Sequence, residues 1–92
     1  MKVIKINAMW CSACLIMNNI WDKVNKKYNF ETITLDYDFD SEIVEKYEPK
    51  DIIPIFIFEE NNKEVFRIVG EHKEKEMIEL IEKSGVLNEK NN

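Results

Sequence analysis

The sequence predicts an α/β domain, a four-stranded mixed sheet with helices on both faces. Three observations favour this class: short apolar runs rich in β-branched residues, helical spacing of apolar residues between those runs, and polar or glycine breaks that separate them. The expected order of elements is β-α-β-α-β-β-α. A chain of 92 residues has room for one such domain. We expect it to span residues 1–87, with a frayed polar tail at 88–92.

The first half of the chain contains two expected strands and the longest helix. Residues 3–6 form a short apolar run, which predicts the first strand. From Cys11 to Tyr28 apolar residues recur at steps of three and four, so a helix should begin at the cysteines. Residues 30–36 alternate and are rich in β-branched side chains, which predicts the second strand.

The middle of the chain predicts a brief helix and a central strand. A helix at 41–47 would be capped by Asp40 or Ser41 and would stop before Pro49. Residues 52–58 are apolar without alternation, which is typical of a strand that is covered on both faces.

The end of the chain predicts a hairpin and a closing helix. Residues 64–69 alternate again after a polar break, so this strand should pair antiparallel with the strand before it. Gly70 ends the hairpin. Met77 and Ile81 then lie on one face of a last helix, with Gly85 at its C-cap.

The connections predict how these elements are arranged. Right-handed crossovers would make the first three strands parallel. The first and last helices would share one face of the sheet, and the short middle helix would cover the other face alone. Such thin cover agrees with the polar residues Lys5, Asn7, Thr32 and Thr34 in the first two strands.

Composition and charge exclude some classes of partner. The chain has 18 acidic and 13 basic residues, and Arg67 is its only arginine, so a nucleic acid is not an expected partner. The apolar run at residues 1–8 is too short for a secretory signal or a membrane span. Two cysteines in a C-x-x-C pair are typical of redox or metal chemistry in a cytosolic protein. We therefore expect a cytoplasmic protein without a membrane partner.

The two cysteines, Cys11 and Cys14, are the candidate catalytic residues. At the first helical position or its cap, the Cys11 sulfur would lie near unpaired backbone N–H groups and the positive end of the helix dipole, which favours the thiolate. Cys11 would attack a substrate disulfide, and Cys14, one turn deeper, would displace the reduced substrate.

Other interpretations of the pair remain open. A C-x-x-C pair supplies two of the four ligands of a structural zinc site, and besides carboxylates the chain offers only His72. Covalent haem attachment needs a histidine after the second cysteine, where this chain has Leu15. Two incidental core cysteines are the remaining alternative.

The motif "WCSAC" opens a helix after a strand, "IIP" ends at Pro54 before an apolar strand, and Gly70 precedes the last helix. Together these features resemble the thioredoxin family in its minimal arrangement, over about residues 2–87. The resemblance implies a thiol–disulfide oxidoreductase that reduces protein disulfides, binds no cofactor and is a monomer. Its electrons would come from NADPH through a flavoprotein thioredoxin reductase. A glutaredoxin-like enzyme coupled to glutathione is one alternative, and a non-catalytic binding or redox-sensor module is another.

The resemblance also implies substrate-binding residues. Pro54 would be a cis-proline facing the cysteines. It would leave the backbone of Ile53 free to pair with an extended substrate segment. Gly70 would lie beside these two residues. Trp10 would form part of the substrate-facing surface, because aromatic residues are enriched on contact surfaces. Its alternative role is to anchor the edge of the sheet.

Lys5 departs from the family, which usually has a buried aspartate six residues before the first cysteine. An ammonium near Cys14 would favour its thiolate, whereas a carboxylate could take its proton. Lys5 is therefore a candidate modulator of proton transfer and charge at Cys14. Alternatively, Lys5 points into solvent through the thinly covered face of the sheet.

Overall fold

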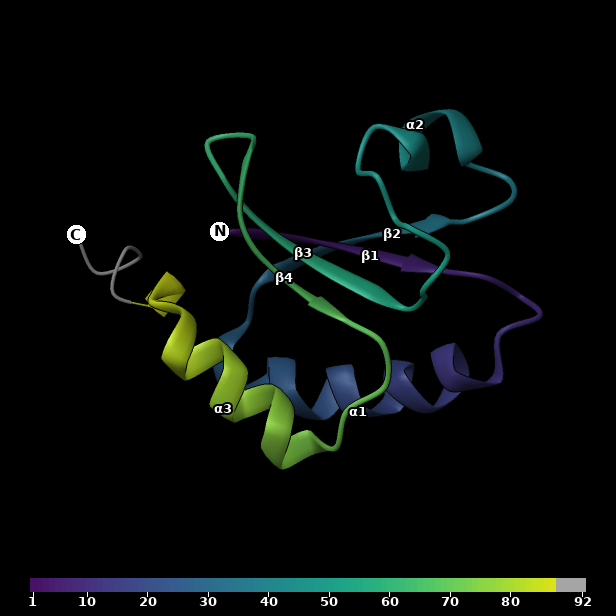
Figure 1. Cartoon of the computed structure of the whole chain (residues 1–92). Coiled ribbons are helices and arrows are strands. Elements are labelled where there is room, and N and C mark those ends of the chain that lie inside the picture. The colour runs from purple at the N-terminus through teal and green to yellow at the C-terminus, as the bar shows by residue number, and fades with distance from the viewer. Residues whose placement is uncertain (88–92) are drawn as a thin grey trace.

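The computed structural model describes residues 1–87, and its elements follow the predicted order (Figure 1). The helices and strands are β1 (Lys2–Asn7), α1 (Ser12–Tyr28), β2 (Glu31–Asp36), α2 (Ser41–Glu45), β3 (Ile55–Glu60), β4 (Lys63–Val69) and α3 (Glu74–Ser84). The predicted α/β class is confirmed. The tail predicted at 88–92 lies outside the described residues.

The sheet has the strand order β2-β1-β3-β4. β1 runs parallel to β2, whereas β3 runs antiparallel to both β1 and β4. The prediction that the first three strands are parallel is therefore wrong. A parallel return needs a connection that spans the sheet, about 20 Å for a six-residue strand. The five residues of α2 cover only about 7.5 Å, and the rest of the connection turns back through three residues with positive φ, Glu48, Lys50 and Asp51. The chain therefore enters β3 at the same end of the sheet at which β2 finishes, and β3 runs antiparallel to β1.

The larger core lies between the sheet and the two longer helices. α1 and α3 lie side by side on one face of the sheet, and α2 lies on the other face, as predicted (Figure 1). Trp21 of α1 is buried against Phe56 and Phe58 of β3, with ring centroids 5.1 and 6.0 Å apart. Its indole Nε1 donates a hydrogen bond to Thr32 Oγ1 at 3.1 Å. This packing fixes α1 against the centre of the sheet.

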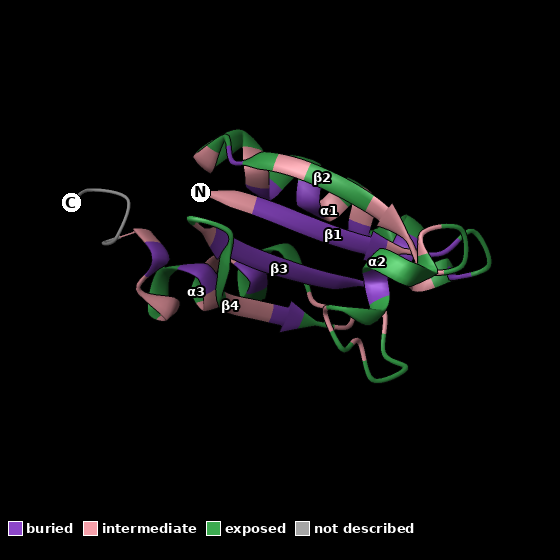
Figure 2. Cartoon of the chain, turned by 90° about the horizontal axis from the view of Figure 1, so that it is seen from above, coloured by how far each residue is buried: buried purple, intermediate pink, exposed green. Residues whose placement is uncertain are grey.

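The smaller core lies under α2, where Val44 packs on four isoleucines of β1 and β3: Ile4, Ile6, Ile55 and Ile57. β1 and β3 are the buried central strands, while β2 and β4 carry exposed residues at the edges (Figure 2). Ile33 and Val65 of these edge strands remain 37% and 40% exposed. The predicted thin cover of this face is therefore confirmed.

The polar residues that the sequence analysis assigned to the thinly covered face lie on the other face of the sheet. Side chains alternate along a strand, so Lys5 and Asn7 share a face with Val3, which packs under α1. Lys5 is only 8% exposed. The interpretation that Lys5, Asn7, Thr32 and Thr34 mark the thinly covered face is wrong, because Thr32 and Thr34 pair with Val3 and Lys5 and all four side chains lie on the α1 face.

Several element boundaries differ from their predictions, those of β3 and β4 for local reasons. β3 begins at Ile55 instead of residue 52, because Pro54 has no N–H for the ladder. The hairpin turn is only Asn61 and Asn62, both with positive φ, so β3 and β4 extend further toward the turn than the polar composition suggested.

None of the helices within residues 1–87 has the length and apolar character needed to cross a membrane.

Candidate active site

Cys11 occupies the N-cap of α1, as the sequence predicted. Its backbone is extended, with φ −94° and ψ 104°, and its N–H donates to the Ala8 carbonyl at 3.2 Å. The Cys11 Sγ accepts a hydrogen bond from the backbone N–H of Cys14 at 3.2 Å. A sulfur that accepts from a first-turn N–H lies where the helix dipole stabilises negative charge. The backbone therefore places a hydrogen-bond donor and the positive end of the helix dipole at the Cys11 sulfur.

Cys14 lies one turn further along α1 and is 1% exposed. Burial, reinforced by a hydrogen bond with the Cys11 side chain, raises the pKa of the Cys14 thiol to about 12. The Lys5 ammonium acts in the opposite direction. Both cysteines are free thiols in this structure. Cys14 is therefore held as a protonated thiol behind Cys11.

The segment before β3 closes the other side of the cysteine pair. The Ile53–Pro54 peptide bond is cis, which confirms the expectation that the resemblance gave. The Cys11 thiol lies 3.9 Å from the Ile53 carbonyl oxygen, and Ile53 packs on the buried cluster of Ala8, Cys11 and Cys14. Two segments that are distant in the sequence therefore meet around the cysteine pair.

Gly70 lies in the segment between β4 and α3. Its N–H donates to the Pro54 carbonyl at 2.8 Å, and its φ is +85°, a conformation that glycine adopts without steric cost. Gly70 thus contacts the backbone of Pro54 and fixes the end of the segment that carries Ile53.

Trp10 stands at the surface next to Cys11 and is 65% exposed. Its indole Nε1 donates to Asp38 Oδ2 at 2.7 Å, and its ring meets the edge of Tyr37 with centroids 6.2 Å apart. The neighbouring Met9 and the more distant Ile52 are also exposed. Trp10 is therefore a surface residue with a fixed orientation.

Two of these contact residues were not predicted. Tyr37 packs against the cysteine cluster as well as against Trp10, and Asp38 orients the indole. Nothing in the local pattern indicates a bond from Asp38 to a tryptophan 28 positions away.

Lys5 lies inside the protein, between β1 and α1. Asn7, two residues further on the same face, donates through Nδ2 to Asn18 Oδ1 of α1 at 3.1 Å. Burial lowers the pKa of Lys5, and the charges of Asp22 and Cys14 partly oppose this shift. The alternative in which Lys5 points into solvent is therefore wrong. Its ammonium belongs to the surroundings of Cys14.

Fold and site together define a small α/β protein with a helix-capping dithiol beside a cis-proline. The thioredoxin family model matches residues 1–83, and the chain belongs to this family. Its fold and its Cys11–Cys14 pair support a thiol–disulfide oxidoreductase in general terms. The sequence matches no curated protein.

Solved thioredoxin structures resemble the chain over most of its length. Fasciola hepatica thioredoxin is 27% identical with a TM-score of 0.77, and the match covers 90% of this chain and 79% of that one. Thioredoxin-2 of a malaria parasite, described as a component of protein secretion machinery, is 26% identical with a TM-score of 0.77, covering 89% and 81%. Thioredoxin 1 of Thermosipho africanus is 22% identical with a TM-score of 0.75 over 100% of both chains, which supports the fold.

Proposed function

We propose that this protein reduces protein disulfides through its Cys11–Cys14 dithiol. The observation that carries the proposal is the placement of the two sulfurs. Cys11 accepts a first-turn N–H at the helix start, and the buried Cys14 thiol lies directly behind it. This arrangement provides one sulfur for attack and a second for resolution.

In the first step the Cys11 thiolate attacks one sulfur of the substrate disulfide. A Cys11–substrate disulfide forms, the substrate S–S bond breaks, and the departing sulfur takes up a proton. In the second step the Cys14 thiol gives its proton to solvent, and its sulfur attacks Cys11. The Cys11–Cys14 disulfide forms, the second substrate sulfur leaves with the electron pair, and it takes a proton from solvent. The dithiol has been oxidised and the substrate disulfide reduced by two electrons.

The Ile53–Pro54 segment would hold the substrate during these steps. Pro54, just before the start of β3, has no N–H, and the Ile53 carbonyl lies beside Cys11. An extended substrate segment could pair with the Ile53 backbone as an additional strand. Exposed Met9, Trp10 and Ile52 supply apolar surface for its side chains.

The oxidised protein needs a source of electrons to complete a cycle. We propose a flavoprotein thioredoxin reductase that draws on NADPH, so the chain itself would bind no cofactor. The protein would act as a monomer in the cytoplasm. A glutaredoxin-like enzyme would instead accept electrons from glutathione, and replacing dithiothreitol by glutathione in the assay below distinguishes the two donors.

Insulin reduction tests the proposed function. With dithiothreitol as the electron donor, the wild-type protein should accelerate reduction of the insulin disulfides. Cys11→Ser should abolish this acceleration, because the attacking sulfur is lost. A wild-type protein that reduces neither insulin nor a small disulfide would contradict the proposal and would favour a binding module. Stoichiometric zinc in the purified protein would point to the metal alternative.

A further inference from the structure

The loop that leads into the active site has an unusual backbone. Between α2 and Pro54, three residues other than glycine have positive φ: Glu48 at 52°, Lys50 at 53° and Asp51 at 64°. Side chains with a Cβ disfavour this conformation, and it persists only where the surrounding structure enforces it. The loop therefore needs contacts from outside its own sequence.

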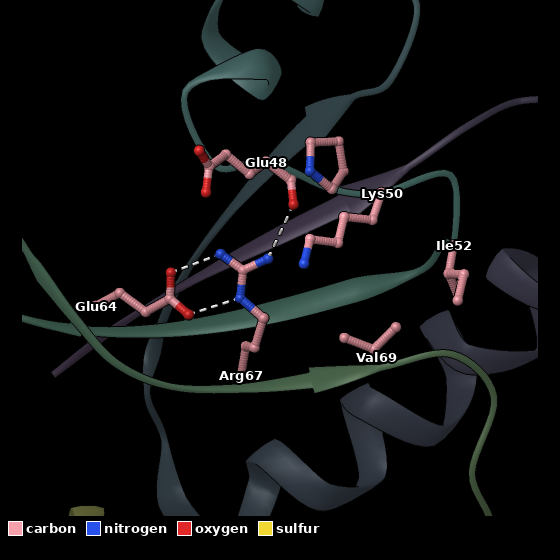
Figure 3. Close-up of a pocket in the computed structure, with 7 residues that line it drawn as sticks. Glu48, Lys50, Ile52, Glu64, Arg67 and Val69 are labelled. Carbon is pink, nitrogen blue, oxygen red and sulfur yellow. Dashed lines mark hydrogen bonds and ion pairs between the residues drawn. The ribbon is translucent and has the colours of Figure 1, made fainter.

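Arg67 supplies such contacts from β4. Its Nη2 donates to the Tyr47 carbonyl at 2.7 Å, and its Nη1 lies 3.5 Å from the Glu48 carbonyl. Glu64 holds the other edge of the guanidinium by bonds of 2.6 Å to Nε and to Nη2 (Figure 3). We call these contacts the Arg67 clamp. The clamp ties the start of the loop to a strand of the sheet.

The clamp lies on the face of the sheet opposite α1. Arg67 pairs with Ile57 of β3, whose side chain belongs to the core under α2. Arg67 and Glu64 border a pocket of about 430 Å³ that also includes Lys50, Ile52 and Val69 (Figure 3). The loop and β4 thus face each other across this pocket, and the guanidinium bridges them through the Tyr47 and Glu48 carbonyls, so loss of the guanidinium removes this bridge.

The same loop delivers Ile53 to the cysteine pair. Only four residues separate Glu48 from Ile53, whose carbonyl lies 3.9 Å from the Cys11 sulfur. At its far end the segment is held by the bond from the Gly70 N–H to the Pro54 carbonyl. Within the loop, the Ile52 N–H reaches the Pro49 carbonyl only at 3.5 Å. The position of Ile53 therefore depends on the anchors at the two ends, together with its own packing on the cysteine cluster and a hydrogen bond of 3.5 Å from the Tyr37 hydroxyl to Asp51 Oδ1.

We infer that Arg67 is a positioning residue that holds the Ile53 backbone in place for an extended protein substrate. This role rests on the proposed function, in which the substrate pairs with Ile53. Arg67 does not touch the reacting sulfurs. Losing the clamp should therefore weaken the binding of a peptide segment and leave the chemistry of the dithiol unchanged.

Two substitutions separate the geometry of the guanidinium from its charge. Arg67→Gln removes the charge and the fork of donors, whereas Arg67→Lys keeps the charge but cannot bond both carbonyls and the carboxylate. Both variants should raise the KM for insulin at least threefold with little change in kcat. Both should reduce a small aromatic disulfide, 5,5′-dithiobis(2-nitrobenzoic acid), within twofold of the wild-type rate.

Lys63→Gln is the matched control, because it removes an exposed positive charge from the start of the same strand. It should leave the KM for insulin unchanged. An Arg67→Gln variant with the wild-type KM would overturn the inference. Equal losses on insulin and on the small disulfide would also overturn it, because they would indicate general damage to the dithiol.

Hydrogen exchange tests the clamp even if the arginine variants do not fold. Glu64→Gln removes the carboxylate charge that holds the guanidinium, so the hydrogen-bonded amides of Glu48 and Ile52 should exchange at least fivefold faster while those of β3 stay unchanged. Unchanged exchange in the loop would overturn the clamp. A wild-type protein that is inert toward both disulfides would refute the proposed function instead, and an active one with unaffected variants would refute only the role of Arg67.

Discussion

Lys5 carries a buried charge, and the effect of this charge on the cysteines can be tested simply. Lys5→Met keeps an unbranched side chain of similar length but removes the ammonium near Cys14. The Cys14 thiolate should then be harder to form, and the mixed disulfide with insulin should persist about three- to tenfold longer at neutral pH. Quenched samples analysed by mass spectrometry would measure this lifetime.

Two observations control that prediction. Lys2→Met removes a charge from the opposite face of the same strand and should leave the lifetime unchanged. The stability of Lys5→Met should not fall, since an apolar side chain replaces a buried charge. An unchanged lifetime in Lys5→Met would show that Lys5 has no part in the resolving step.

The raised pKa of Cys14 has a consequence for stability at high pH. In the folded state the thiol holds its proton up to about pH 12, whereas the ordinary value is 9.0. Between these values the folded protein binds more protons than the unfolded chain, so the contribution of Cys14 is present below pH 9 and is lost toward pH 12. Urea unfolding of the reduced protein should therefore show stability falling over this range. The fall should be smaller in Cys14→Ala, and equal slopes for both proteins would contradict the assignment.

Single residues of the site differed in how far the sequence could predict them. The cysteines could be placed because their chemistry depends on a local spacing at the start of a helix, whereas the placement of Pro54 opposite them came from the family resemblance. Lys5 could not be placed correctly, since the face of a strand residue depends on how the whole strand alternates against α1. The bond from Trp10 to Asp38 depends on two loops that meet only after folding.

The packing of α1 on the sheet gives a prediction for this helix. Trp21 is 2% exposed and donates to Thr32. Trp21→Phe removes this hydrogen bond and leaves unfilled volume beside Phe56, so unfolding should become easier by about 1–3 kcal/mol. Trp10→Phe, at an exposed position, is the matched control and should change stability by less than about 0.5 kcal/mol. Equal effects in urea unfolding would show that the α1 face is not the main core.

Element types followed from local patterns, whereas strand direction did not. The periodicity of residues 11–28 and the alternation of 64–69 correctly indicated a helix and a strand. The direction of β3 depends on whether α2 is long enough to carry the chain back across the sheet. That length is fixed by Pro49 and by the positive-φ residues after the helix, so the five-residue α2 leaves β3 antiparallel.

For the molecule as a whole, the proposed direction of electron flow predicts a reducing dithiol. The midpoint potential of the Cys11–Cys14 pair should lie below about −240 mV, as a reductant of cytosolic disulfides requires. Tryptophan fluorescence in graded dithiothreitol buffers would measure it, with Cys14→Ser as the control that shows no transition. A midpoint potential above about −200 mV would instead favour a glutathione-coupled enzyme or an oxidant of protein thiols.

Trapping the mixed disulfide tests the central claim most directly. Cys14→Ser, incubated with insulin without added reductant, should accumulate a covalent adduct through Cys11, because attack still proceeds and resolution does not. Peptide mapping by mass spectrometry should assign the adduct to Cys11, and Cys11→Ser should form none. Absence of an adduct in Cys14→Ser, or an equal adduct at Cys14 in Cys11→Ser, would contradict the division of roles between the two cysteines.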